Sequence, residues 1–326
     1  MASPFPESDT FPNQPMDPAL CNFDICPLSR SIFRYQPNLA MAIVPLVLFA
    51  LLTVGHMISG WRYKTWTYTI SILIGLFLEL AGYVGRILAN DNPFLKDYYL
   101  LQIVVLTCAP VLFCAAIYIC LGRIVVICGP EMSRLRPTWY TPIFLTCDVV
   151  SLALQGAGGA LTSTADDADG QQRGINIMLG GLSFQVATIA LFGFLFLEFL
   201  WRTHASHKVS TDIQNASFAQ SKKWTAFLWS LGTATMLILI RSIYRVAEMA
   251  GGYDGKLMKD ENTFLVFEGI LIVVAVLLLL VFHPGAVMDG FGRTAKPRVT
   301  DNTAYKAAAW GSSGEEGDLE MSPMHP

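Results

Sequence analysis

The chain has 326 residues, of which 53% are hydrophobic and only 14% are charged, with a formal net charge of −3. Soluble domains carry about 25% charged residues, whereas here apolar runs of about 20 residues alternate with short polar loops. This composition excludes a soluble globular enzyme, and it disfavours a nucleic-acid-binding protein, which would need a strongly basic surface. It indicates an integral membrane protein.

Seven apolar stretches are long enough to cross a bilayer core of roughly 30 Å as helices, which takes about 20 residues each. They lie near residues 38–60, 66–88, 99–127, 141–162, 174–200, 224–248 and 264–283. Strands of a β-barrel would alternate in hydrophobicity over about ten residues, but the run from Ile270 to Phe282 is uninterrupted. The predicted fold class is therefore all-α, a seven-transmembrane helix bundle.

The segments outside the spans predict the domain organisation and the orientation. Residues 1–37 have no basic n-region and no apolar run, so we expect an extracellular N-terminal tail rather than a cleaved signal peptide. Residues 38–284 form the membrane domain, and residues 285–326 are expected to be a disordered cytoplasmic tail. Lys and Arg gather in cytoplasmic loops. One set of loops, together with the tail, holds thirteen of these residues and the other holds six, which predicts an outside N-terminus and a cytoplasmic C-terminus.

The cysteines and the one glycosylation sequon fit this orientation. Cys21 and Cys26 lie together in the outside tail, where a disulfide and two free thiols are both open alternatives. The other five cysteines lie in or beside spans and are interpreted as apolar packing. The sequon at Asn215 falls in a loop assigned to the cytoplasm, so we expect it to carry no glycan.

Ionisable residues inside spans are costly and are therefore candidates for function. Most of them fall in the half of the membrane that is predicted to be outer, and their charges sum to zero. These are Glu79, Arg86, Arg241, Arg245, Glu248 and Glu268, and the neutral Gln102 lies in the same half. Two interpretations remain open. The residues form ion pairs that fix the packing, with Arg86 and Glu248 snorkelling to the interface, or they line a polar cavity for a zwitterionic or cationic head group.

Asp148 differs from this set because no basic residue is expected at its depth in the fourth span. It shares a helix face with Ser151 and Gln155. An unpaired Asp in hydrocarbon is protonated, or it faces water or a cationic ligand. A neutral Asp that is hydrogen-bonded across helices and a group that binds a ligand or a proton are both open. Further along the span, three glycines and one alanine are expected to allow close helix approach: Gly156, Gly158, Gly159 and Ala160.

Motifs of the main alternative functions are absent from the sequence. There is no G-x-x-x-x-G-K-[ST] loop, so ATP hydrolysis by that route is not expected. There is no H-E-x-x-H motif, and no Cys-x-x-Cys pair or His cluster lies in the spans, so we expect no metal. The seventh span has no Lys for a retinal Schiff base, and the signatures of G-protein-coupled receptors are missing. We therefore expect no cofactor, no catalytic residues and no enzymatic activity.

The polar positions, taken in combination, resemble those of a known family. They are Tyr35-x-Pro37, Glu79-x-x-Gly82-Tyr83-x-x-Arg86, Gln102, Ala109-Pro110, Tyr118, Asp148-x-x-Ser151-x-x-x-Gln155-Gly156-x-Gly158-Gly159, Arg241-Ser242-x-Tyr244-Arg245-x-x-Glu248, Glu268 and His283-Pro284-Gly285. Together they look like the fungal RTA-like proteins, the lipid-translocating exporter family of aminocholesterol-resistance type. The resemblance implies a seven-helix fungal protein of the plasma membrane. It also implies a link to the release of sphingoid long-chain bases, to resistance against toxic sterols and other drugs and, in one branch, to porphyrin uptake.

We therefore expect translocation or export of amphipathic lipids such as sphingoid long-chain bases, with a role in sterol and drug resistance. Membrane lipids and the amphipathic substrate are the expected partners, and nucleic acid is not. The candidate substrate-binding residues are the polar set of the outer half together with Asp148 and Gln155. The alternative is a seven-helix membrane sensor of lipid or stress, which alters lipid handling indirectly through a cytoplasmic protein partner.

Overall fold

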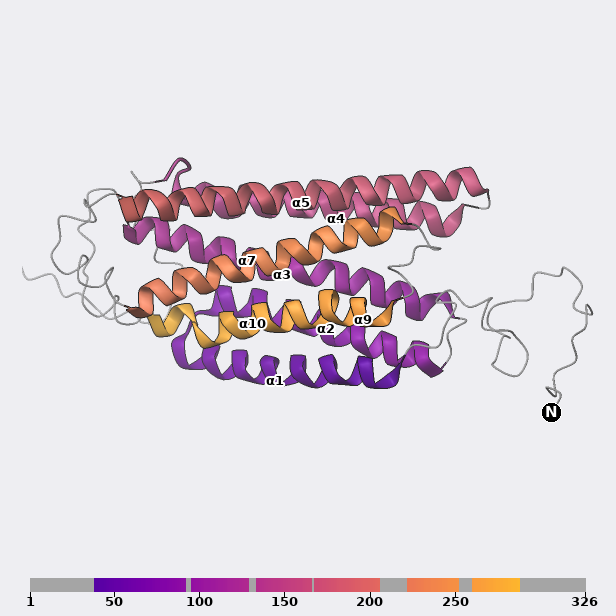
Figure 1. The fold of residues 1–326 in the computed structure, drawn as a ribbon, viewed down its shortest axis with the longest axis horizontal. Coiled ribbons are helices and arrows are strands. Elements are labelled where there is room, and N and C mark those ends of the chain that lie inside the picture. Colours follow the sequence, from indigo (N-terminus) through magenta and orange to yellow (C-terminus); the bar gives the residue numbers. More distant parts are fainter. Residues whose placement is uncertain are drawn as a thin grey trace, which may run out of the picture.

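A computed structural model describes residues 38–91, 95–128, 133–165, 167–205, 222–251 and 260–287. Within these ranges every regular element is a helix (Figure 1). Cys21, Cys26, the sequon at Asn215 and most of both tails lie outside the described residues, so the predictions made for them stay predictions.

Seven helical segments of the described chain are long and apolar enough to cross a membrane, as predicted. Six are single helices: α1 (Leu39–Tyr63), α2 (Trp66–Asp91), α3 (Lys96–Cys128), α4 (Pro137–Thr164), α5 (Ala168–Ala205) and α7 (Lys222–Ala250). The seventh, Glu261–Val287, contains α9 (Glu261–Phe264), the π-helix η4 (Leu265–Ile270) and α10 (Leu271–Val281). At 38 residues, α5 is longer than predicted, because the polar turns before its apolar run are also helical.

The ends of α1 show how local sequence sets the helix bounds. The side chain of Asn38 accepts a hydrogen bond from the backbone N–H of Ala40 at 3.0 Å, which satisfies one of the free amides of the first turn. Lys64 ends the helix in the left-handed conformation, with φ at 52°. We call the two ends of the bundle the Asn38 end and the Lys64 end after these residues.

A second cap starts α9 at the Asn38 end. The Asp260 side chain accepts hydrogen bonds from the backbone N–H of Asn262, at 3.1 Å, and from the Thr263 hydroxyl. The Thr263 hydroxyl is the largest of the causes that lower the pKa of Asp260 below its ordinary value, and backbone amides at the start of the helix act in the same direction. The start of the seventh span is thus held by an ionised side chain.

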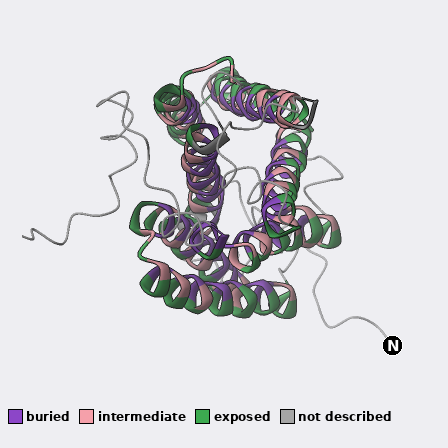
Figure 2. Ribbon diagram, turned by 90° about the vertical axis from the view of Figure 1, so that its left-hand side faces the viewer, coloured by how far each residue is buried: buried purple, intermediate pink, exposed green. Residues whose placement is uncertain are grey.

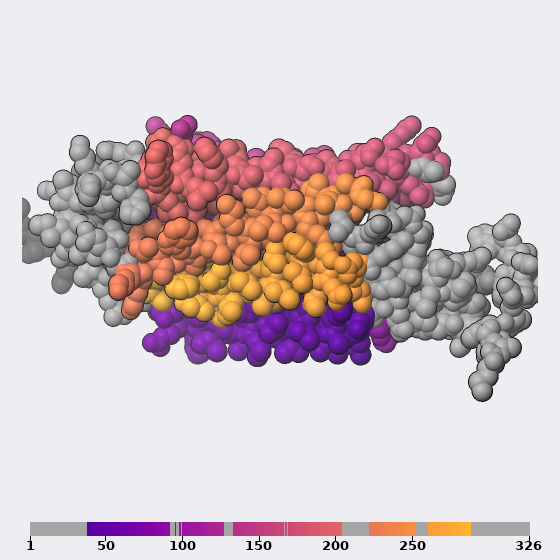
Figure 3. Space-filling view, viewed as in Figure 1, coloured from indigo at the N-terminus to yellow at the C-terminus, as the bar shows by residue number. Residues whose placement is uncertain are grey.

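The helices run nearly side by side, with α3 in contact with α2, α4, α5 and α7. Figure 3 shows one face on which α5, α7, α10 and α1 lie in that order, and the helix contacts agree. Viewed end-on, the buried parts of the helices face the inside of the bundle and the exposed parts face outward (Figure 2). The outward residues of α1 include Leu51, Val54 and Ile58, which suits a surface that faces lipid.

An aromatic cluster packs α4 and α5 against α3 in the half of the bundle near the Lys64 end. The ring centroid of Phe192 lies 4.5 Å from that of Tyr118 and 5.2 Å from that of Phe144. Phe144 in turn stacks on Tyr140, near the start of α4. Edge-to-face contacts of this kind stabilise by about 0.5–1.5 kcal/mol beyond their buried area. The cluster therefore fixes α4 beside α3 directly next to Asp148.

Candidate functional site

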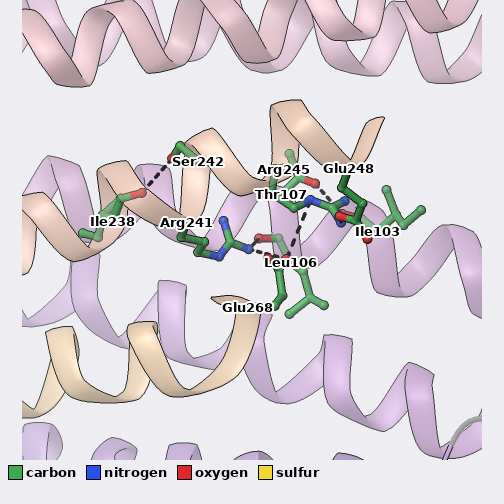
Figure 4. A network of polar contacts seen from close by, with 9 residues as sticks. All are labelled: Ile103, Leu106, Thr107, Ile238, Arg241, Ser242, Arg245, Glu248 and Glu268. Carbon is green, nitrogen blue, oxygen red and sulfur yellow. Dashed lines mark hydrogen bonds and ion pairs between the residues drawn. The ribbon is translucent and has the colours of Figure 1, made fainter. Parts of the chain in front are cut away.

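A buried ion pair joins α7 to the π-helix (Figure 4). One terminal nitrogen of Arg241 donates to Glu268 Oε1 at 2.6 Å and to the backbone carbonyl of Leu106 at 2.7 Å. The side chains of Arg241 and Glu268 are 3% and 0% exposed. Because a carbonyl of α3 accepts from the same guanidinium, this pair ties three spans together in the interior.

A second pair lies one helical turn further along α7. Arg245 donates to Glu248, three residues away on the same helix, and both side chains are buried. The Nε atom of Arg245 also lies 3.9 Å from Glu268 Oε1, so the two pairs form one network (Figure 4). The predicted shared face of Arg241, Arg245 and Glu248 is confirmed. Glu248 does not snorkel, because it is buried.

The π-helix positions Glu268 at this network. Runs of π-helix are rare in proteins and often occur at functional sites. In η4 the turn also brings Gly269 against α2, where a Cβ atom would lie 2.8 Å from the hydroxyl of Tyr83. On the other side of Glu268, Phe267 stacks on Tyr244 with ring centroids 4.9 Å apart. Contacts with α2 and α7 thus hold the segment that carries the carboxylate.

Arg86 forms a third pair, with a partner that the sequence placed in a loop. Its terminal nitrogen donates to Glu261 Oε1 at 2.8 Å, and its guanidinium lies 4.3 Å from the ring centroid of Phe264. Glu261 also accepts from the backbone N–H of Asn38. Of the two open interpretations, the snorkelling of Arg86 is not what the structure shows, because the side chain is 2% exposed and is held between the starts of α1 and α9.

Glu79 lies within the same region but in none of these pairs. It is 0% exposed, and neither of its carboxyl oxygens has a hydrogen-bond partner among the described residues. Arg241 and Glu268 are within electrostatic range of it. The Tyr83 hydroxyl, one turn further along α2, and the side-chain oxygen of Gln102 on α3 are also buried without such a partner.

The structure changes the charge balance that the sequence suggested for this group. The predicted set sums to zero, but Glu261 belongs to the group as well, because it pairs with Arg86. Among the described residues the group then holds one more carboxyl than guanidinium groups. We call it the charged cluster; its ionisable members are Glu79, Arg86, Arg241, Arg245, Glu248, Glu261 and Glu268.

Asp148 lies in a separate polar group between α3 and α4. It is 0% exposed, and its Oδ2 accepts a hydrogen bond from the hydroxyl of Tyr118 at 3.0 Å. Its Oδ1 has no partner in the part of the chain that the structure describes. This hydrogen bond joins α4 to α3, as expected in the interpretation of Asp148 as a group that is hydrogen-bonded across helices. The sequence did not indicate Tyr118 as the donor, although it lies one turn from Cys114 on the same buried face of α3.

Gln155 continues this polar group toward α5. The hydroxyl of Ser151 donates to the carbonyl of Gly181 at 3.0 Å, so its oxygen must accept from the amide nitrogen of Gln155 at 2.8 Å. The same amide nitrogen also donates to Gln185 Oε1 at 3.0 Å. This arrangement leaves the side-chain oxygen of Gln155 without a partner among the described residues. Gln185, which the sequence analysis did not single out, is thus a member of the group.

Close packing of α4 and α5 supports that network. A Cβ atom on Gly158 would lie 2.6 Å from the backbone nitrogen of Met178 and 2.7 Å from the carbonyl oxygen of Gly174. Small residues permit such backbone contact between helices in a membrane. The prediction is confirmed for Gly158 only. It is wrong for Gly156 and Gly159, because a Cβ atom there would meet nothing within 4 Å.

The two polar groups occupy different levels along α3. Arg241 is bonded to Leu106 and Asp148 to Tyr118. These α3 residues are twelve positions apart, or roughly 18 Å at the rise of an α-helix. Cys114, between them, is within electrostatic range of both Asp148 and Arg241. The predicted residues are therefore all buried, but they form two groups along one helix rather than a single site.

Two buried histidines, His56 and His283, gather near the Lys64 end. The ring centroids of His56 and His283 are 6.4 Å apart. His56 Nε2 contacts the carbonyl of Val276, and His283 Nδ1 accepts from the backbone N–H of Gly285. These contacts hold the end of the seventh span against α1. Across the described ranges, no three His, Cys, Asp or Glu residues come together as metal ligands.

The comparisons with known proteins agree with the resemblance seen in the sequence. Residues 72–290 match the family described as RTA1 like protein. The sphingoid long-chain base transporter RSB1 of Saccharomyces cerevisiae is 29% identical over 281 residues, which cover 78% of this chain and 73% of the relative. Protein RTA1 of the same organism is 29% identical over 278 residues, covering 78% and 84%.

A third relative, protein RTM1 of Saccharomyces cerevisiae, is 30% identical over 219 residues, covering 67% of this chain and 68% of its own. No solved structure matches the chain. The family match takes in five whole spans, most of the second span and both polar groups. The chain is a seven-helix membrane protein that belongs to the RTA1-like protein family.

Proposed function

We propose that this protein moves amphipathic lipids with a cationic head group, such as sphingoid long-chain bases, across the plasma membrane, with its N-terminus outside. The similarity to a protein named sphingoid long-chain base transporter supports the substrate class. The role is transport rather than chemical modification of the lipid, and it would contribute to tolerance of toxic sterols and other drugs.

The observation that carries the proposal is a set of buried carboxyl oxygens without hydrogen-bond partners. Among the described residues, Glu79, Asp148, Glu198 and Glu268 each have at least one such oxygen. Glu198 differs from the others because two partly exposed arginines, Arg134 and Arg202, pair with its other oxygen. An ammonium group has three N–H donors and no acceptor, so it fits acceptors of this kind. Burying a carboxylate without a partner is costly, and a cationic head group would offset that cost.

The neighbouring residues suggest how each part of the lipid is handled. Arg241 and Arg245 orient the acids of the charged cluster through their ion pairs. Gln155, whose side-chain oxygen is free to accept, suits a hydroxyl of the head group. The hydrocarbon tail would lie between helices against lipid. Because the sequence has no phosphate loop, movement would run downhill or be coupled to protons, and Asp148 is the candidate proton carrier.

A reconstitution experiment tests this function. Sealed liposomes that contain the purified protein are loaded with a fluorescent sphingoid base, and the rate at which the base moves between leaflets is measured. We expect movement well above that of empty liposomes, and loss of that movement in Asp148→Asn. The matched control is Glu198→Gln. Glu198 is an acid of α5 that pairs with Arg134 and Arg202 outside both polar groups, and this variant should move the base like the wild type.

Folding must be checked separately, since Asp148 also contributes a hydrogen bond. Each variant is compared with the wild type by thermal unfolding before reconstitution. Movement no faster than in empty liposomes, from wild-type protein shown to be folded, would overturn the proposal. That outcome would favour the sensor alternative and direct attention to partners of the cytoplasmic loops.

A further inference from the structure

The ion pairs of the charged cluster leave one acid over. Arg86 pairs with Glu261, and Arg241 pairs with Glu268. Arg245 pairs with Glu248 on its own helix. Each arginine of the cluster therefore has a carboxylate in direct contact, and Glu79 is the one acid of the cluster with no ion pair among the described residues.

The groups that face Glu79 do not replace this missing partner. On its own helix, Tyr83 lies one turn further along, and its hydroxyl has no hydrogen-bond partner among the described residues. From α7 comes Arg241, which is already bonded to Glu268 and to the carbonyl of Leu106. From η4 comes Glu268 itself, which is a second acid and therefore repels a charge on Glu79.

Apolar side chains of α3 and α1 pack against α2 on either side of Glu79. On α3, Leu106 packs against Gly82 and Phe113 packs against Gly75, so the stretch opposite Glu79 lies between these two contacts. From α1, the ring of Phe49 lies 5.7 Å from that of Tyr83. An ionised Glu79 would thus be a buried anion without a counter-ion, and such a group either takes up a proton or binds a cation.

We propose that Glu79 is an exchange site, at which a proton and the ammonium group of the transported lipid replace each other. This inference rests on the proposed function and names the position that receives the head group. With the site empty of lipid, the carboxyl holds a proton and is neutral. When the ammonium arrives, the O–H bond of Glu79 breaks, the proton leaves to solvent, and the carboxylate accepts hydrogen bonds from the cation. One positive charge enters and one leaves, so the charge of the cluster is unchanged.

The acceptor atoms in this region suit an ammonium group. The two carboxylate oxygens of Glu79, the Tyr83 hydroxyl and the side-chain oxygen of Gln102 all lack partners among the described residues, so they offer enough acceptors for the three N–H donors. The three arginine pairs stay intact in both states, and they repel a second cation. Exchange at a single carboxyl also excludes uncharged lipids, because without a cation the proton has no reason to leave.

Proton release on binding tests the inference directly. Sphinganine, a saturated sphingoid base, is added to purified wild-type protein in a weakly buffered detergent solution, and a pH indicator measures the change in pH. We expect one proton released per base bound. In the acidic range, the apparent affinity for sphinganine should fall about tenfold for each unit by which the pH is lowered, because protons compete with the ammonium group for Glu79. N-acetylated sphinganine, which carries no charge, should release none. Glu79→Gln should abolish the release, whereas Glu198→Gln should retain it.

The outcomes separate this inference from the proposed function. If sphinganine binds and moves but releases no proton, or if Glu79→Gln still releases one, the exchange site is refuted and transport stands. If the folded wild type neither binds nor moves the base, the proposed function fails first. If Glu79→Gln does not fold, infrared difference spectra of the wild type test whether a buried carboxyl loses its proton when the base binds. Addition of base must remove the signal of a protonated carboxyl, and an unchanged signal would refute the proposal.

Discussion

The contact between α4 and α5 predicts that Gly158→Ala destabilises the bundle. A Cβ atom at this position would lie 2.6 Å from the backbone nitrogen of Met178, 2.7 Å from the carbonyl oxygen of Gly174 and 3.0 Å from the Cα atom of Met178. All three are backbone atoms of α5, which cannot rotate away as the end of a side chain can. The two helices must therefore move apart for the methyl group to fit.

The size of the effect follows from two opposing contributions. Inserting one carbon into a well-packed interior costs about 1–3 kcal/mol, whereas Ala is favoured over Gly in a helix by up to about 1 kcal/mol. Gly159→Ala is the matched control, because a Cβ atom there meets nothing within 4 Å and only the favourable contribution applies. The helix contribution is common to both variants and cancels, so their free energies of unfolding should differ by the packing cost of about 1–3 kcal/mol, or roughly 5-fold to 140-fold in the unfolding equilibrium.

Unfolding of the purified variants in mixed micelles, with increasing dodecyl sulfate and helix content followed by circular dichroism, measures this difference. Gly174→Ala approaches the same contact from the other helix. Its Cβ atom would lie 2.6 Å from the backbone nitrogen of Thr162, so it should resemble Gly158→Ala. Equal stability of Gly158→Ala and Gly159→Ala would refute the close approach of α4 and α5. It would also remove the support for the position of Gln155 beside α5.

Three further perturbations test other contacts. Arg241→Gln removes the close ion pair of the buried Glu268 and should cost about 3–5 kcal/mol, whereas replacement of both residues by Met should restore much of the melting temperature. Tyr118→Phe leaves Asp148 without its donor and should cost about 1–3 kcal/mol in the same assay. The third concerns Asp260, whose pKa is lower in the fold than its ordinary value. Its stabilisation is therefore present at neutral pH and is lost as the pH falls through the lowered pKa. Amide exchange in α9 should accelerate there, and Asp260→Ala should remove that dependence.

The seven spans could be predicted because a lipid environment demands them. A run of about 20 apolar residues is the dominant signal in the sequence, and every predicted span is a helix in the structure. The ends of the helices were harder to predict from the sequence. The polar first turns of α5, around Gln171 and Arg173, carry no such signal, although the helix extends through them.

The candidate residues were predictable one by one, but their partners were not. Spacing along α7 was enough to place Arg241, Arg245 and Glu248 on one face, because helical periodicity is local. The pairing of Arg86 with Glu261 joins residues 175 positions apart, and it depends on how the seventh span starts, which a hydropathy pattern does not reveal. For the same reason the sequence suggested close helix approach at three glycines. Of these, only Gly158 lies against the backbone of α5, and this depends on how the facing helix is placed.

The π-helix has a consequence for how the family can diverge. A π turn contains one residue more than the α turn it replaces, so losing one residue that follows Glu268, either Gly269 or Ile270, would restore a regular helix. Each residue advances an α-helix by about 100°, and the side chains before the lost residue would rotate by that amount relative to those after it. Glu268 would then turn away from Arg241 while α10 kept its place. A one-residue deletion in a relative would thus mark a branch of the family in which the buried ion pairs are arranged differently.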